Sequence, residues 1–175
     1  MAGPSASIYG ANAVFGVINV ITRRGEKMQP SVAVSLSDDG WRTVRGNAVR
    51  SLENGSAVTL GLTLGDKAGR DVRYAAPSGY LQLSDGTFVD SGVAQNLDRT
   101  GMDKLFARWE SNDTDLTLIH GARRHHPSAP LYNALFNDPA LYLEDVLSRI
   151  SLSAKRDLAD DILCNVNVAY NRYRF

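Results

Sequence analysis

Apolar and polar residues alternate along most of the chain, in short segments that read as β-strands. The clearest case is Ser56–Gly65, where Val58, Leu60, Leu62 and Leu64 point one way and the residues between them point the other. Similar alternation predicts seven strands: 31–37, 41–52, 56–65, 102–110, 115–124, 145–155 and 162–170. The sequence therefore predicts an all-β, antiparallel protein whose strands each have one apolar face.

The connections between these strands are of two kinds. Four are tight turns, at 38–40, 53–55, 112–113 and 159–160, and two are long, at 66–101 and 125–144. Strands that run up and down place successive connections at opposite ends, so both long connections are expected at one end of the sheet. Transmembrane barrels combine short turns on one side with long loops on the other. Within the first long connection, residues 80–89 are expected to form a small hairpin around 84–86.

Composition narrows the function classes. The 175 residues carry 19 basic and 19 acidic side chains, so no excess positive charge suggests a nucleic-acid partner. Hydrophobic residues make up 43%, yet no apolar run reaches the ~18 residues of a transmembrane helix. Cys164 is the only cysteine, which excludes a disulfide framework within the chain.

The opening segment, residues 3–25, differs from everything after it. Small and turn-forming residues, among them Gly3, Pro4 and Gly10, lead into the β-branched run Gly16–Thr22, which Arg23 and Arg24 end. A glycine-rich loop before a buried strand could also belong to a nucleotide-binding site. The glycines do not form the dinucleotide-binding pattern and no Gly-Lys-Ser/Thr follows, so that alternative is disfavoured.

This segment resembles the end of the plug domain of TonB-dependent outer-membrane receptors. The matching residues cover about the first seventh of the chain: Gly3, Pro4, Ser5, Tyr9, Gly10, Ala13, Gly16, Val17, Ile18, Asn19, Ile21, Thr22 and Arg23. The family has further plug sequence before this point, whereas the chain begins Met1-Ala2 without a signal peptide, so we expect a fragment. The resemblance implies the end of a plug at 1–25 and about seven strands of an up-and-down transmembrane β-barrel at 26–175.

What the resemblance implies is transport and not enzymatic activity. In this family a plug closes a barrel of ~22 strands, and a scarce ligand (a ferric siderophore, cobalamin or haem) crosses the bacterial outer membrane. The expected partners are the TonB energy-coupling complex, acting through the missing N-terminal part, the ligand and outer-membrane lipid, with no cofactor and no nucleic acid. The alternative from another class is a soluble β-sandwich that binds a ligand or a protein, since it would show the same alternation.

Candidate site residues follow from the long connections and from the opening segment. Aromatic and basic residues on loops often contact ligands, although they can equally pack the loops together. The loop candidates are Arg70, Arg73, Tyr74, Tyr80, Tyr132, Phe136 and Tyr142, and the plug-motif candidates are Gly3, Pro4, Tyr9, Gly10, Gly16, Asn19, Arg23 and Arg24. Arg23 and Arg24 are expected to pair with carboxylates of the barrel wall.

Two further expectations concern histidines and strand-end aromatics. His120, His125 and His126 do not form a convincing metal site, because three or four converging ligands are needed. No catalytic nucleophile motif is present. Aromatic residues near strand ends are expected to form an interfacial belt: Trp41, Trp109, Tyr170 and Tyr173.

Overall fold

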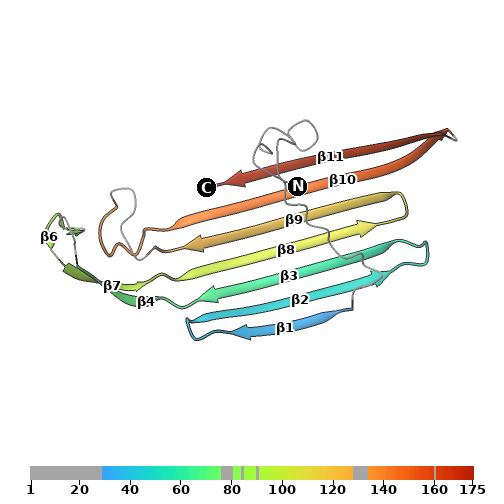
Figure 1. The fold of residues 1–175 in the computed structure, drawn as a ribbon. Coiled ribbons are helices and arrows are strands. Elements are labelled where there is room, and N and C mark those ends of the chain that lie inside the picture. The colour runs from blue at the N-terminus through green and yellow to red at the C-terminus, as the bar shows by residue number, and fades with distance from the viewer. Residues whose placement is uncertain (1–28, 76–80, 84, 90, 128–133, 160) are drawn as a thin grey trace.

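The computed structural model describes residues 29–75, 81–83, 85–89, 91–127, 134–159 and 161–175. Within them every regular element is a strand, as the ribbon in Figure 1 shows. The bounds are β1 Ser31–Leu36, β2 Trp41–Ser51, β3 Ala57–Lys67, β4 Arg70–Ala75, β5 Leu81–Gln82, β6 Phe88–Val89, β7 Ser91–Leu97, β8 Thr100–Glu110, β9 Thr114–His125, β10 Leu143–Ala159 and β11 Ile162–Arg174. No helix in the described part is long and apolar enough to cross a membrane.

Seven strands form one antiparallel sheet in the order β1-β2-β3-β8-β9-β10-β11. Each strand pairs with its neighbour along the chain once the long connection between β3 and β8 is set aside. These are the seven strands that the alternation predicts, so the fold class is confirmed. The sheet is not closed, and β1 and β11 are its two edges (Figure 1). It is an all-β antiparallel wall of the kind expected for part of a barrel.

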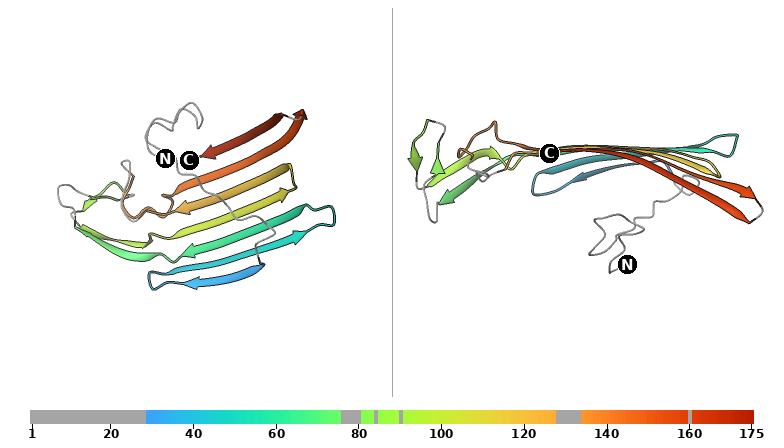
Figure 2. Two further views of the ribbon diagram at one scale, coloured as in Figure 1. Left: turned by 45° about the vertical axis from the view of Figure 1, so that its right-hand side comes forward. Right: turned by 90° about the horizontal axis from the view of Figure 1, so that it is seen from above.

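The wall is a single layer with one apolar face. Seen from above in Figure 2, the seven strands lie in one gently curved sheet. Over the described residues no second layer covers its apolar side chains, and many are largely exposed: Val32, Val34, Leu36, Val44, Leu60, Leu62, Leu64, Leu105, Leu116, Leu118, Ile150, Leu152, Val166 and Val168. A soluble sandwich buries such a face against a second sheet. The described strands therefore lack the packing that the sandwich alternative requires.

Polar residues mark the two borders of the apolar face, and the borders differ between strands. In β2, Arg42 and Arg50 point to this face, and the stretch between them is Val44, Gly46 and Ala48. In β10, the corresponding border residues are Ser148 and Arg156. The apolar face is therefore a band three positions tall in each of these strands.

The band does not follow the hydrogen-bond register. Val44, just inside the border of β2, is aligned through β3, β8 and β9 with Val146 of β10. The residue just inside the border of β10 is instead Ile150. The band thus moves by about one residue per strand, that is ~3.3 Å along the strand for every ~4.8 Å across the sheet. The strands are therefore tilted by about 35° from the direction perpendicular to the band. Strands of transmembrane barrels have this tilt relative to the barrel axis.

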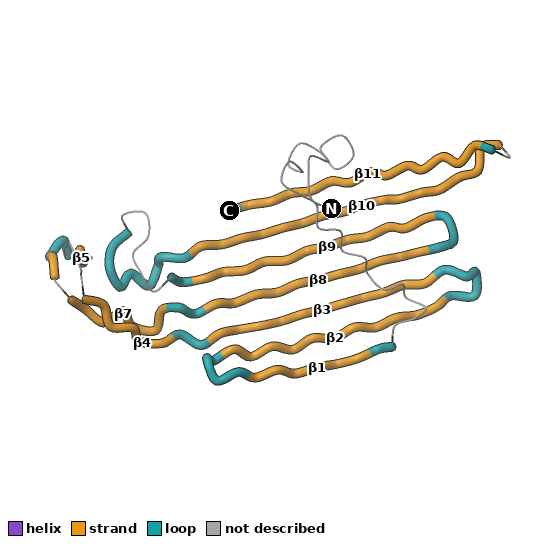
Figure 3. Tube along the Cα trace, in the orientation of Figure 1, coloured by secondary structure: helices purple, strands orange, loops and turns teal. Residues whose placement is uncertain are grey.

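The connections fall at the ends where the sequence places them. The tube in Figure 3 shows that the turns after β2, β8 and β10 lie at one end of the wall. The turn after β1 and both long connections lie at the other end. Gly40 and Gly55, which have positive φ of 91° and 76°, close two of the tight turns. The hairpin expected at residues 80–89 is present as β5 and β6.

The aromatic-belt prediction is half wrong. Trp109 and Tyr170 lie on the apolar face, aligned with Val58 and Ile150. Trp41 and Tyr173 lie on the opposite face, because each is directly next in sequence to a residue that points to the apolar face. There the Tyr173 hydroxyl donates a hydrogen bond to Asp145. Closeness to a strand end is thus insufficient to place an aromatic residue in the belt.

Candidate functional site

The long connections build a cluster of their own beyond the end of the wall. We call the described parts of residues 68–99 and 126–142 the loop cluster. In it β4 pairs with β7 and extends the hairpin that begins as β3 and β8. Ala94, Leu97 and Phe136 are buried together, and Tyr74, Leu81 and Leu83 pack around them. The sequence predicts no hairpin at β4 and β7, because their charged and glycine residues interrupt the alternation.

Phe136 docks the second long connection onto the first. Its side chain is only 4% exposed, and its backbone N–H donates to the carbonyl of Gln82 at 2.7 Å. The ring of Tyr74 meets it edge to face, with centroids 6.1 Å apart. Gly92 lies directly against it, since a Cβ at this position would be 2.5 Å from Cε1 of Phe136. The pocket for Phe136 therefore requires glycine at residue 92.

Polar contacts fasten the cluster to the wall. The N–H of His126 donates to the carbonyl of Arg99 at 2.9 Å, and the N–H of Asp98 donates to the carbonyl of His126 at 2.7 Å. The Asp98 carboxylate pairs with Lys67 at 2.8 Å and with Arg70 at 3.0 Å. The hydrogen bond from Lys67 lowers the pKa of Asp98, against the opposing effect of burial. Asp98 is thus an ionised anchor between β3, β4 and the second loop.

His126 is a structural residue of this junction. Its Nδ1 donates to the carbonyl of Leu141 at 3.1 Å, since a carbonyl can only accept. Burial lowers the pKa of His126, and the nearby charge of Arg99 adds to this effect. His125 is bonded separately, through Nδ1, to the Thr100 hydroxyl at 2.8 Å. Within the described ranges no three His, Cys, Asp or Glu side chains are placed to hold a metal ion.

The structure separates the loop candidates that the sequence groups together. Tyr74 and Phe136 are in contact, and Phe136 belongs to the packed core of the cluster. Arg70 and Arg73 are exposed on β4. Tyr142 lies elsewhere, under the guanidinium of Arg124 at 4.5 Å and beside His126. Tyr80, Tyr132 and the whole plug motif lie outside the described residues, namely Gly3, Pro4, Tyr9, Gly10, Gly16, Asn19, Arg23 and Arg24.

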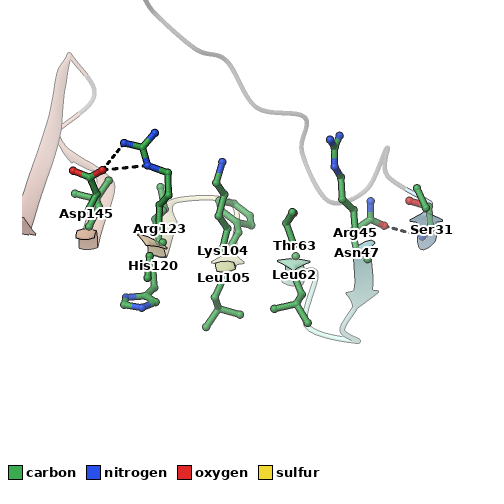
Figure 4. Close-up of a pocket in the computed structure, with 18 of the residues that line it drawn as sticks. Ser31, Arg45, Asn47, Leu62, Thr63, Lys104, Leu105, His120, Arg123 and Asp145 are labelled. Carbon is green, nitrogen blue, oxygen red and sulfur yellow. Dashed lines mark hydrogen bonds and ion pairs between the residues drawn. The ribbon is translucent and has the colours of Figure 1, made fainter. Parts of the chain in front are cut away.

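A second feature, which the sequence interpretation does not single out, is a hollow of about 750 Å³ on the wall. The residues at its polar side include Arg45, Asn47, Thr63, Lys104, Arg123 and Asp145, which rise together from one face in Figure 4. Leu62, Leu105 and His120 point away from them, to the opposite face. Gly61 and Gly121 line the floor and leave room because they lack side chains. Glycines at polar-face positions of β3 and β9, the two strands that flank β8, are the signal that could have found it.

Electrostatics make this hollow basic. Arg123 pairs with Asp145 at 2.6 Å, and the Tyr173 hydroxyl donates to the same carboxylate at 2.5 Å. Arg45 and Lys104 have no carboxylate within ion-pair reach among the described residues, and both are exposed. Further along the polar face, Arg108 pairs with Asp115 and Glu110. The polar face of the wall can therefore accept an anionic or strongly polar surface.

Comparison with known proteins shows partial similarity to a transporter. The chain is 31% identical over 115 residues to the vitamin B12 transporter BtuB of Vibrio vulnificus (strain CMCP6), a match covering 65% of this chain and 19% of that protein. The chain spans about a fifth of the length of that relative. No family model and no solved structure matches. The similarity agrees with the family that the opening segment resembles, and it leaves the ligand of this chain open.

Proposed function

We propose that this chain is part of a TonB-dependent outer-membrane transporter that takes up a scarce ligand, and that it has no enzymatic activity. In this proposal residues 1–25 end a plug domain, and residues 26–175 supply the first strands of a barrel wall. The localisation is the bacterial outer membrane. The TonB energy-coupling complex would act through plug sequence that precedes Gly3 in related proteins.

The observation that carries the proposal is the tilted apolar band on an uncovered face. Exposing a Val or Leu side chain to water costs free energy, whereas exposing it to hydrocarbon does not. A single antiparallel layer whose strands tilt by about 35° relative to its apolar band suits a barrel wall in a bilayer. Long connections at one end only, and the resemblance of residues 3–25 to a plug end, support the transporter class within the barrel proteins.

The polar face and the loop cluster receive different roles in this proposal. The hollow with Arg45 and Lys104 would face the barrel interior, where the plug and the passing ligand lie. Exposed Arg70 and Arg73 on the loop cluster would meet the ligand first, with Tyr80 and Tyr132 as further candidates. Phe136 instead holds the loops together. Cobalamin is the first ligand to test, because the relative is a vitamin B12 transporter; ferric siderophores and haem follow.

Disrupting the gene in its own bacterium tests the function. Uptake of labelled cobalamin, a ferric siderophore and haem is measured in the wild type, in the disrupted strain and in a strain without TonB. We expect the uptake of one ligand to fall to the level of the TonB-deficient strain, and expression of the intact gene to restore it. Unchanged uptake of all three ligands would contradict the proposed function.

The physical basis is tested separately on the purified 175-residue chain. Sedimentation in buffer and in neutral detergent should give aggregates in buffer and a defined protein–detergent complex in micelles, because the apolar band needs a cover. A monodisperse monomer in detergent-free buffer would favour the soluble alternative.

A further inference from the structure

A small hollow of about 260 Å³ lies on the wall at the end of β11. Its lining is His120, Val146, Ser148, Arg172 and Arg174. Ser148 is aligned with His120 on one side and with Arg172 on the other, and Val146 is aligned with Arg174. Directly aligned residues of antiparallel strands point to the same face. Ser148 shares its face with Ile150 and Leu152, because alternate residues of a strand point the same way. The hollow therefore lies on the apolar face.

Two arginines on an apolar face need an explanation. Ordinary barrel walls avoid them at the bilayer midplane, where each costs ~2–4 kcal/mol, but the cost falls to ~0–1 kcal/mol near the interface. Ser148 is the border residue of the band in β10, and Arg172 is its neighbour in β11. Arg172 therefore lies at the border on the long-loop side, and Arg174 lies just beyond it. This is the depth of lipid headgroups.

The charge of the hollow is uncompensated. On the same face, Arg124 pairs with Glu144 at 2.7 Å. Arg172 and Arg174, by contrast, have no carboxylate within ion-pair distance in the described part of the chain, and both are exposed. His120 and Ser148 close the floor of the hollow by a hydrogen bond between Nδ1 and Oγ of 2.9 Å. Both guanidinium groups are thus available to an anion at the border of the apolar face.

We propose that this hollow binds the phosphate of a membrane-lipid headgroup, with Arg172 and Arg174 as its ligands. Guanidinium groups match phosphate oxygens through paired N–H donors, and the acyl chains of the same lipid would lie along the band below. The proposal rests on the proposed function, because it requires the apolar face to contact lipid. It adds a specific lipid site to a wall that would otherwise contact lipid only through apolar side chains.

The test compares two lipids that differ in headgroup charge. The purified chain in neutral detergent is titrated with dimyristoylphosphatidic acid or with phosphatidylcholine of the same chain length, and native mass spectrometry counts bound lipids. Each arginine near an anionic lipid surface contributes roughly a fivefold gain in affinity. We expect the wild type to bind phosphatidic acid more tightly than phosphatidylcholine. In R172Q/R174Q the ratio of the two affinities should fall about fivefold for each arginine removed.

The matched control is R149Q. Arg149 is exposed, has no ion-pair partner among the described residues and lies beside Asn171 of β11, but it points to the polar face. It should keep the full preference for phosphatidic acid. Equal binding of the two lipids by the wild type would overturn the proposal. So would equal losses in R149Q and in the double variant.

Membrane contact is measured in parallel, so that the two proposals can fail separately. In a W41F background, brominated phosphatidylcholine vesicles should quench the fluorescence of Trp109, which lies on the apolar face. Quenching without a preference for phosphatidic acid would overturn only the lipid site, whereas absence of quenching would overturn both proposals. If the reading frame extends further, the same variants are compared in the longer protein. Loss of the wild-type preference there would show that another strand neutralises the arginines, and would also overturn the site.

Discussion

The wall and the loop cluster differ in the exposure of their apolar residues. The wall exposes a whole face of Val, Leu and Ile side chains, and Leu62 in its middle is 48% exposed. The loop cluster is much smaller, yet it contains Ala94, Leu97 and Phe136, which are nearly all of the buried apolar residues in the described part of the chain.

Under the proposed function, this difference reflects two solvents. In water a sheet gains stability by covering its apolar face, and the loop cluster follows that rule with a small core and polar anchors. The wall instead satisfies its backbone groups through strand pairing and leaves its apolar side chains outside, as the hydrocarbon of a bilayer requires. The transition occurs within a few residues, between the end of β3 at Lys67 and the start of β4 at Arg70. Three predictions test this contrast.

The largest expected effect is from Phe136→Ala. Loss of a buried phenyl ring should cost about 3–5 kcal/mol of docking free energy in the loop cluster. Hydrogen exchange should then accelerate more than 100-fold at the amides of residues 91–97 and 134–142, with the wall amides unchanged. Phe88→Ala, at a 60% exposed position in the same cluster, is the control and should change little. Equal protection in both variants would show that the cluster has no core of its own.

The second effect concerns the wall. Leu62→Arg should lower the free energy of unfolding in phosphatidylcholine vesicles by about 2–4 kcal/mol, because the new charge lies near the middle of the apolar band. Ser151→Arg, at a similar depth on the polar face, should cost less than about 1 kcal/mol. Denaturant unfolding followed by tryptophan fluorescence measures both. Equal costs on the two faces would mean that neither face contacts hydrocarbon.

The smallest effect is a two-stage loss of docking in acid. Burial lowers the pKa of His126, so its contribution is complete above the unfolded-state value of about 6.5 and declines as the pH falls below it. Asp98 also has a lowered pKa, so its contribution disappears only below about pH 4. Spin labels are attached at Q82C and A140C in a C164S background. The distribution of distances between them should broaden in these two stages. H126Q should abolish the first stage and D98N the second; a single stage in all variants would contradict the assignment.

Sequence reasoning works best where alternation is regular. It predicts all seven wall strands, their order and the end at which the long connections lie, because each strand carries its own period-two pattern. It fails for β4 and β7, since Arg70–Ala75 and Ser91–Leu97 carry no sustained alternation and pair only because β3 and β8 bring them together. For the same reason it groups Tyr74, Phe136 and Tyr142 as loop aromatics, although Tyr142 lies at the rim beside Arg124.

What the sequence determines by itself is therefore local: the strands, their two faces and the lengths of their connections follow from neighbouring residues alone. The tilt of the apolar band, the basic hollows and the burial of Phe136 depend on the register between strands far apart in sequence. Only the tertiary structure decides those, because one residue of slippage in a ladder moves every side chain of a strand to the other face.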